Sequence, residues 1–429
     1  MKEKFIKSTI ILLIGGILTK ILGMIIKIIM AREIGSEGLG TYMLILPTFM
    51  LLISLSQFGI PLALSKLISE NKRNNKKLIF SLLPLLILIN ILLIILIVLL
   101  SPIISIKLLH NKDTYISILS MALVIPFTTI SAVCRSYFFG KEKMLPHVIS
   151  NIVEDLVRLI IIITLIPIFK PLGLKYVVCF LILINIISEI ASTLILLLFL
   201  PKNIKITKKD LKPNKIYIKD SLKISIPNTA SKLIGSIGFF FEPIILTTFL
   251  LNNYSLDFIT KEYGIISGFV IPLILLPSFF TLAISQALLP VISNDYVNKN
   301  IKTIKRKVKL AIALSLLIGL PVTIILIINP NFFLNTIYHT NEGITYTRIL
   351  APICLLQYIQ SPLSSILDAI GKSQDNMIST LLGTIVRTLS LIIFSTLKIG
   401  LYSLIIAIAM NIIVTTFYQI KKVRKHLTF

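Results

Sequence analysis

The sequence predicts an all-α integral membrane protein with about 12 transmembrane helices, and three observations support this fold class. Of its 429 residues, 55% are hydrophobic and 14% are charged, whereas an ordinary soluble domain carries about 25% charged residues. Apolar runs recur along the whole chain, and Leu78 to Leu100 alone is long enough to cross a hydrocarbon core of about 30 Å. The loops between these runs are alternately rich and poor in basic residues, which is typical of a chain that crosses a membrane many times.

The apolar runs, and the Gly and Pro residues that interrupt them, place the helices along the chain. The first run, Ile10 to Met30, is too long for a removable signal segment and contains Lys20 and Lys27, so we expect a membrane helix there. Pro272 and Pro277 interrupt the eighth run and mark either a bending point or a close-packing site. The expected spans are 5–30, 42–67, 78–101, 115–138, 147–169, 174–200, 221–249, 264–291, 308–329, 346–369, 376–396 and 399–419.

The distribution of lysine and arginine predicts the orientation of these spans. The N-terminus, the loops after even-numbered spans and the C-terminal tail hold most of the basic residues, and the other loops hold few. Cytoplasmic loops carry this excess, so we expect a multi-pass protein of the cell membrane with both termini in the cytoplasm. The net charge of +25 therefore reports topology, and no nucleic-acid partner is expected.

The longest basic loop divides the predicted spans into six and six. We expect an N-terminal six-helix lobe at 1–200, a cytoplasmic basic linker at 201–220 and a C-terminal six-helix lobe at 221–429. In transporters built from such halves, the substrate route lies between the lobes. Pro61 and Pro290 each lie shortly before a predicted cytoplasmic basic loop, which is a weak similarity between the two halves.

The sequence contains no pattern of residues that would indicate catalysis or metal binding. Cys134, Cys179 and Cys354 lie far apart, and the four histidines form no ligand pair. Phosphate-binding loops, nucleophile elbows and the HExxH pattern are absent from the sequence. We therefore expect a protein that is not an enzyme and has no cofactor, and transport would draw on an ion gradient or the membrane potential.

Charged residues within the apolar spans are the candidates for a substrate route. A charge at the centre of a bilayer costs about 2.5–3.5 kcal/mol, so such residues usually face a polar cavity or one another. Lys20 and Lys27 are seven residues apart and lie on nearly the same helix face, about 10 Å apart along the axis. The candidate substrate-binding residues are Lys20, Lys27 and Arg32 in the first span, Glu154 and Arg158 in the fifth, Glu189 in the sixth, and Lys232 and Glu242 in the seventh.

Some of these candidates also have a simpler structural interpretation. Glu154 and Arg158 are spaced i,i+4 with the acid first, so they either neutralise each other or line the cytoplasmic entrance. Lys27 and Arg32 are near enough to a helix end to extend their charges to the interface. Lys20, Glu189 and Glu242 lie too deep for this, and we expect them to face an internal cavity. Lysines from the first and seventh spans would suit an anionic cargo such as a lipid-linked phosphate.

Several segments resemble one known family. Ala31 to Pro47, Ser267 to Ser293 and Ser364 to Met377 are similar to its first-to-second, eighth and tenth helices. Its consensus around the fourth and fifth helices is matched in order and spacing by Arg135, Tyr137, Gly140, Met144, Pro146, Ser150, Glu154 and Arg158. These segments resemble the polysaccharide and peptidoglycan-precursor flippases of the multidrug/oligosaccharidyl-lipid/polysaccharide (MOP) exporter superfamily, in the branch of the stage V sporulation protein B.

The resemblance implies a MATE/MurJ-like fold whose two six-helix lobes enclose a central cationic cavity. It also implies that the chain moves an undecaprenyl-linked saccharide from the cytoplasmic to the outer leaflet by alternating access, with membrane lipid around it and a coupling ion or the membrane potential as its energy source. A drug or organic-cation antiporter of the same superfamily is the alternative, and Glu189, Glu242 and Asp368 would serve it. A non-transporting scaffold finds no support, because the loops are too short to form a docking domain.

Overall fold

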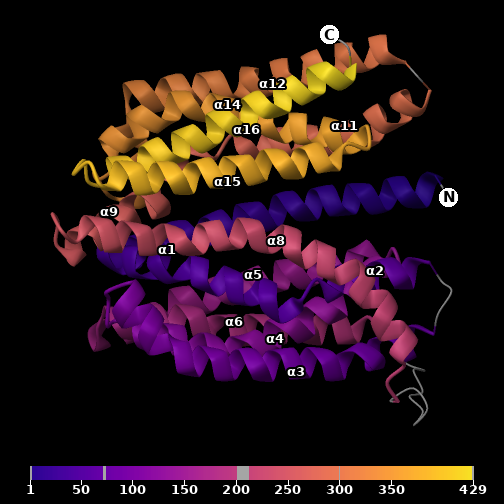
Figure 1. The fold of residues 1–429 in the computed structure, drawn as a ribbon, viewed down its shortest axis with the longest axis horizontal. Coiled ribbons are helices and arrows are strands. Elements are labelled where there is room, and N and C mark those ends of the chain that lie inside the picture. The colour runs from indigo at the N-terminus through magenta and orange to yellow at the C-terminus, as the bar shows by residue number, and fades with distance from the viewer. Residues whose placement is uncertain (1, 71–73, 201–211, 299, 428–429) are drawn as a thin grey trace. The chain divides into compact units, whose positions relative to one another are not determined.

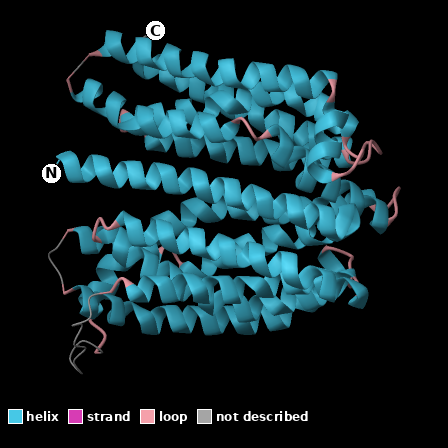
Figure 2. Cartoon of the chain, turned by 180° about the vertical axis from the view of Figure 1, so that it is seen from behind, coloured by secondary structure: helices cyan, strands magenta, loops and turns pink. Residues whose placement is uncertain are grey.

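The computed structural model describes residues 2–70, 74–200, 212–298 and 300–427, and the regular elements in these residues are all helices (Figures 1 and 2). The chain forms two compact units, Met1–Phe240 and Phe241–Phe429. The division falls within one helix, beyond the predicted linker at 201–220. Residues 201–211 of that linker lie outside the described residues. The predicted lobe boundaries stay a prediction.

The first unit is a bundle of long helices. It contains α1 (Lys2–Gln57), α2 (Ile60–Ser69), α3 (Asn75–Pro102), α4 (Thr114–Gly140), α5 (Met144–Phe169), α6 (Leu174–Leu198) and most of α8 (Lys215–Leu250). A π-helical turn, Ile103–Leu108, extends α3, and a short 3₁₀ turn, Lys170–Leu172, precedes α6. Helix α4 packs against α2, α3 and α6, and α5 packs between α1 and α6. Helix α4 is therefore the central helix of this unit (Figure 1).

Helix α1 is 56 residues long because it joins the first two predicted spans end to end. The two halves meet at Gly35, whose φ of 66° and ψ of −174° are not helical. Only glycine adopts this conformation readily, since a β-carbon would clash with the backbone. A second break at Phe58 and Gly59, both with positive φ, separates α1 from α2. The second predicted span, 42–67, is thus made of two helical pieces.

A buried polar side chain links three helices of the first unit. The side-chain amide of Asn90 on α3 donates to the carbonyl oxygen of Ser56 at 3.4 Å, and its oxygen accepts a bond of 3.1 Å from the Thr129 hydroxyl on α4. Asn90 is 6% exposed, and its amide also donates to the carbonyl oxygen of Leu86 at 2.8 Å, so this buried polar side chain is fully hydrogen-bonded. This polar residue within an isoleucine- and leucine-rich span therefore has a packing role.

The second unit is built around a central helix of its own. Its helices are α9 (Leu256–Gly264), α10 (Ile271–Ile274), α11 (Ser278–Val297), α12 (Ile301–Ile328), α13 (Pro330–Tyr338), α14 (Ile344–Ala369), α15 (Ser373–Ser395) and α16 (Tyr402–Leu427). A π-helical turn, Ile265–Val270, joins α9 to α10. Helix α14 packs against α11, α12 and α16, and α15 packs against α16. The chain bends by 53° between α10 and α11, next to Pro277, so the predicted interruption of the eighth span is present.

The helices account for the predicted spans. Among the described residues, nine single helices are long and apolar enough to cross a membrane, and the bent pair Leu256–Ile274 with Ser278–Val297 makes a tenth. One of the nine is α1, which Gly35 divides into two spans. Helix α5 is 26 residues long, and the charges of Glu154, Asp155 and Arg158 keep it outside that count. The fold is thus an all-α membrane protein with about 12 spans, as the sequence predicts.

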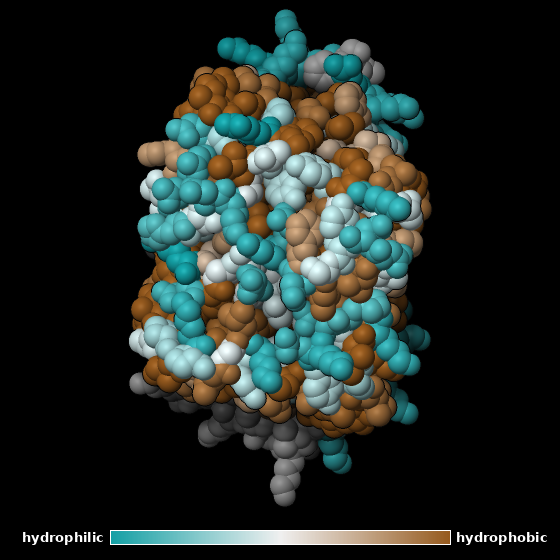
Figure 3. Space-filling view, turned by 90° about the vertical axis from the view of Figure 1, so that its left-hand side faces the viewer, coloured by the Kyte–Doolittle hydropathy of each residue, from teal (hydrophilic) through white to brown (hydrophobic). Residues whose placement is uncertain are grey.

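The surface of the helices fits a lipid environment. Large apolar side chains on α3, such as Ile87, Leu92 and Leu99, are 56%, 57% and 66% exposed. Burying such side chains away from water is worth about 1.5–3 kcal/mol each, so a row of them is stable only against lipid or protein. Figure 3 shows one face of the structure, on which hydrophilic side chains are frequent among the apolar ones.

We expect Gly319→Ala to destabilise the second unit. A β-carbon at Gly319 on α12 would lie 2.4 Å from the ring of Tyr358 on α14. Tyr358 is fully buried and its hydroxyl donates to the carbonyl oxygen of Ile274 at 2.6 Å, so the ring has little room to move. Overpacking of this kind costs about 1–3 kcal/mol. Thermal unfolding in detergent micelles measures the loss, and Gly23→Ala, where no atom lies within 4 Å, is the control that should lose nothing.

Candidate functional site

Three helices of the first unit bring charged side chains together in the apolar interior. Arg135 of α4 forms ion pairs with Glu154 of α5 and with Glu189 of α6, the latter at 2.9 Å. The same Nη2 atom donates to the Ser192 hydroxyl at 2.9 Å. The side chains of Glu154 and Glu189 are 11% and 10% exposed. One guanidinium thus joins carboxylates from two neighbouring helices.

Arg158 completes this network from the far side of Glu154. Its Nη2 atom lies 2.6 Å from Glu154 Oε1, and its Nη1 atom lies 3.2 Å from Asp155 Oδ1. Nη2 also donates to the Ser188 hydroxyl at 3.3 Å. The predicted pairing of Glu154 with Arg158 is therefore present, as part of a larger cluster that also includes Arg135, Asp155 and Glu189. We call these five residues the unit 1 charge cluster.

The helical repeat explains why the cluster forms. Glu154 and Arg158 are one turn apart on α5, and Ser188 and Ser192 are one turn apart on α6, beside Glu189. Both serines lie on the buried side of α6, so they face the arginines of α4 and α5. Helix α4 contributes Arg135 one turn before its C-terminal end, where α4 and α6 pack together.

The cluster holds more negative than positive charge. Three carboxylates, Glu154, Asp155 and Glu189, face two guanidinium groups. The Nε atoms of both arginines are buried and have no hydrogen-bond partner among the described residues. A buried cluster with an unmatched carboxylate and unused donors is a candidate for taking up a proton or for changing its pairing.

A second cluster lies in the second unit. Arg387 of α15 forms an ion pair of 2.5 Å with Glu242 near the end of α8, and the Tyr263 hydroxyl of α9 donates to Glu242 at 3.1 Å. Glu242 is 5% exposed and Tyr263 is 3% exposed. Because the two charges neutralise each other, this unit 2 charge cluster can lie in an apolar interior.

The predicted basic candidates differ from the acidic candidates in their exposure. Lys20, Lys27 and Arg32 of α1 and Lys232 of α8 are exposed within the first unit. Lys20, Lys27 and Lys232 form no ion pair with any described residue. The acidic candidates are thus buried and paired, whereas these three lysines are accessible.

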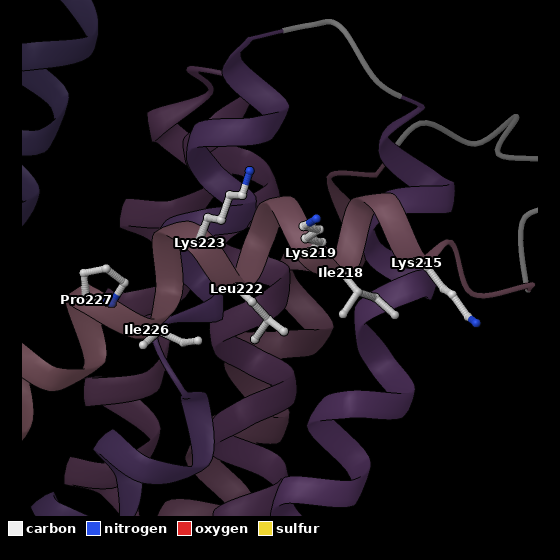
Figure 4. Close-up of a pocket in the computed structure, with 7 residues that line it drawn as sticks. All are labelled: Lys215, Ile218, Lys219, Leu222, Lys223, Ile226 and Pro227. Carbon is white, nitrogen blue, oxygen red and sulfur yellow. The ribbon is translucent and has the colours of Figure 1, made fainter.

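The start of α8, which is the described part of the basic segment after the sixth span, has a basic face and an apolar face. At the start of α8, Lys215, Lys219 and Lys223 follow one another at four-residue intervals beside Ile218 and Leu222, along an open groove of about 500 Å³. In Figure 4 the side chains of Lys219 and Lys223 point away from those of Ile218 and Leu222. This separation is typical of a helix end at a membrane surface. The lysines at 202, 205, 208 and 209 lie outside the described residues.

Sequence reasoning missed three partners in these clusters. Arg135 was part of the family consensus, but nothing in its spacing shows that it reaches Glu189, 54 residues away. Arg387 and Tyr263 pair with Glu242 only through the tertiary fold. One sequence signal bears on these partners: each carboxylate deep in a span needs a cationic partner. This makes Arg387 one candidate partner for Glu242, but it does not distinguish Arg387 from the other basic residues. In the part of the chain that is described, no group of three His, Cys, Asp or Glu residues could hold a metal ion.

Together with the fold, the family matches assign the chain to the multi-pass transporters of the MOP superfamily. Residues 5–296 match the family described as Polysaccharide biosynthesis protein, and residues 266–393 match the MatE family. The chain belongs to the Polysaccharide biosynthesis protein family, and within it to the branch similar to the stage V sporulation protein B.

Two curated relatives from Bacillus subtilis (strain 168) place the chain more closely. It is 31% identical to the stage V sporulation protein B, over 99% of this chain and 84% of that protein. It is 20% identical to the lipid II flippase MurJ, over 90% of this chain and 76% of that protein. A flippase is a transport protein, which agrees with the prediction that the chain is not an enzyme.

Solved structures share the fold. A multidrug resistance MATE family transporter of the MOP superfamily, in an inward-facing conformation, matches with a TM-score of 0.75 and 18% identity over 95% of this chain and 94% of that chain. A MOP superfamily transporter from Pyrococcus furiosus, described as having a binding pocket of reverse polarity, matches with a TM-score of 0.62 and 17% identity over 100% and 96%.

We expect Arg135→Met to destabilise the first unit by about 3–5 kcal/mol, because it leaves buried carboxylates without a partner. The double variant Arg135→Met/Glu189→Gln should recover part of this loss, since Glu154 keeps Arg158 and Glu189 no longer carries a charge. Thermal unfolding in detergent micelles measures both. Lys261→Met breaks an ion pair with Glu342 whose side chains are 40% and 35% exposed, and it should cost less than about 1 kcal/mol. A double variant no more stable than Arg135→Met would contradict the pairing.

Proposed function

We propose that this protein flips a lipid-linked saccharide from the cytoplasmic to the outer leaflet of the cell membrane by alternating access. The proposed cargo is a polysaccharide or peptidoglycan precursor that is linked through phosphate to an undecaprenyl chain. Two similarities support this: the chain belongs to a polysaccharide biosynthesis family, and a relative that matches 90% of this chain is a lipid II flippase. In this proposal both termini are cytoplasmic, as the loop charges predict.

The observation that carries the proposal is the contrast between paired acids and accessible lysines. Glu154, Glu189 and Glu242 are buried and bound to arginines, so they are poorly placed to receive an organic cation. Lys20, Lys27 and Lys232 are exposed and form no ion pair with a described residue. Ammonium groups in an apolar span attract phosphate strongly, since the low dielectric increases the interaction. An anionic cargo is therefore favoured over a cationic one.

In this mechanism the three lysines bind the phosphate groups, and the two clusters hold the helices of each unit together while the cargo moves. The unit 1 charge cluster has one carboxylate more than it has guanidinium groups, so it offers a site for proton uptake. We assign this site to Glu189, the carboxylate that α6 contributes to the cluster. A proton bound there on one side of the membrane and released on the other would couple transport to an ion gradient. The membrane potential supplies about 2.3 kcal/mol per charge per 100 mV.

An antiporter for drugs or organic cations is the second candidate, because residues 266–393 match the MatE family. It requires a carboxylate that can release its arginine to bind the cation. Raised ethidium resistance of cells that express the protein, lost in Glu242→Gln, would favour this candidate.

We expect Lys20→Ala/Lys27→Ala to lower the flipping rate at least about tenfold, because each lost phosphate contact in a low dielectric weakens binding by more than 1 kcal/mol. The measurement is the protection of a fluorescent lipid-linked sugar from an external quencher in proteoliposomes. Lys107→Ala/Lys112→Ala removes the same charge from exposed positions near the far end of α3 and should flip at the wild-type rate. Equal rates for the two double variants would refute the role of the lysines.

We expect Glu189→Gln to remove the dependence of flipping on a pH gradient while leaving exchange without a gradient measurable. The substitution keeps the shape of the side chain and a hydrogen-bond acceptor for Arg135, so the fold should tolerate it. Flipping in proteoliposomes with and without an imposed pH gradient tests this. A Glu189→Gln protein that responds to the gradient like the wild type would exclude Glu189 as the proton site.

A further inference from the structure

The first unit contains an apolar groove that the transport mechanism does not use. It lies between α3, α4 and α6, has a volume of about 630 Å³, and is lined by side chains such as Phe80, Leu83, Ile130 and Leu197. This volume is within the range of about 300–1,000 Å³ that ligand pockets occupy. Ile130 and Leu197 are each 48% exposed, so the groove is open along its side.

One end of the groove is polar and basic. Lys76 at the start of α3 and Lys141 just after α4 both line this end, together with Asn74 and Asn75. The side chain of Asn74 already accepts bonds from the backbone amides of Lys76 and Lys77, at 3.0 and 3.3 Å. An anion at this end would therefore meet the two ammonium groups rather than the helix N-terminus. The Asn75 side-chain oxygen is buried and has no hydrogen-bond partner among the described residues, so it can accept a bond from a ligand hydroxyl.

The depth of the groove indicates what fills it. From Asn74, just before α3, to Leu83 the lining extends over nine residue steps, which corresponds to about 13 Å along the axis. Half of a hydrocarbon core of about 30 Å is about 15 Å, so the groove is as deep as one leaflet. A single acyl chain fits this depth, whereas a long polyprenyl chain would extend well beyond it. The loop between α2 and α3 is one of the basic loops, so the open end is on the predicted cytoplasmic side.

We infer that this groove binds an anionic phospholipid of the cytoplasmic leaflet, with one acyl chain between α3, α4 and α6 and its phosphate between Lys76 and Lys141. Negative lipid headgroups and basic protein surfaces attract each other at the membrane interface. Here the apolar groove adds a binding site for one acyl chain of the lipid. The site is separate from the proposed cargo route, because none of Lys20, Lys27 and Lys232 lines it. The inference of a lipid site therefore does not depend on whether the cargo is a lipid-linked saccharide or an organic cation.

The test is lipid retention by the purified full-length chain. Delipidated protein is titrated with phosphatidylglycerol or with phosphatidylcholine of the same acyl chains, and bound lipid is counted by native mass spectrometry. Phosphatidylglycerol should be preferred by the wild type, and Lys76→Ala/Lys141→Ala should weaken its binding about 10- to 30-fold and abolish the preference. A phosphatidylglycerol with a photoreactive acyl chain should crosslink to peptides of α3, α4 and α6.

Two matched controls keep the result specific. Lys107→Ala/Lys112→Ala removes the same charge near the other end of α3 and should bind like the wild type. Ile130→Trp fills the groove from its open side and should weaken both lipids, whereas Ile160→Trp, at a position 59% exposed on α5, should change neither. Each variant is compared at equal thermal stability, so misfolding does not imitate a loss of binding.

Several outcomes would overturn the inference. Equal retention of the two lipids would exclude recognition of the anionic headgroup, and crosslinks outside α3, α4 and α6 would place the lipid elsewhere. Displacement of phosphatidylglycerol by inorganic phosphate alone would show that the acyl chain contributes nothing. Competition by a polyprenyl-linked saccharide at lower concentration than phosphatidylglycerol would assign the groove to the cargo instead.

Discussion

The pairing of Arg135 with carboxylates from two neighbouring helices is the interaction on which the first unit depends. Apolar contacts between helices give little preference for one arrangement over another in lipid. A buried charge without a partner is strongly unfavourable, so the three helices must meet where Glu154 and Glu189 both reach the guanidinium. The cluster therefore fixes the rotation of each helix as well as its neighbours.

The second unit meets the same constraint with fewer groups. Glu242 has one arginine and one tyrosine hydroxyl as partners, and its charge is fully matched. The first unit instead keeps a carboxylate in excess. The two units thus differ in electrostatic character even though each neutralises its deepest acids with arginine. Lys20, Lys27 and Lys232 are accessible cations within the spans. An ammonium is a compact charge that can form and break phosphate contacts without a fixed geometry.

Much of the fold follows from the sequence because lipid imposes a simple rule on it. Apolar length and breaking residues predicted the spans, and the i,i+4 spacing predicted the pairing of Glu154 with Arg158. What sequence reasoning did not foresee was set by tertiary contact or by backbone detail. Arg387 lies 145 positions from Glu242, and no local pattern connects them. The break at Phe58 and Gly59 depends on two consecutive positive φ values, and Phe58 is not a residue that predicts one. The groove beside α3 was missed because it depends on how α4 and α6 pack, and its lining residues are ordinary apolar side chains.

The charges of α5 also bear on how the chain is assembled. Three ionisable residues in its middle make this helix a poor substrate for independent insertion by the translocation machinery, since each costs about 2.5–3.5 kcal/mol at mid-bilayer. Its partners Arg135 and Glu189 are synthesised just before and just after it. Helix α5 is therefore expected to leave the translocon together with α4 and α6 as a three-helix group, so the biogenesis of this segment is cooperative rather than helix by helix.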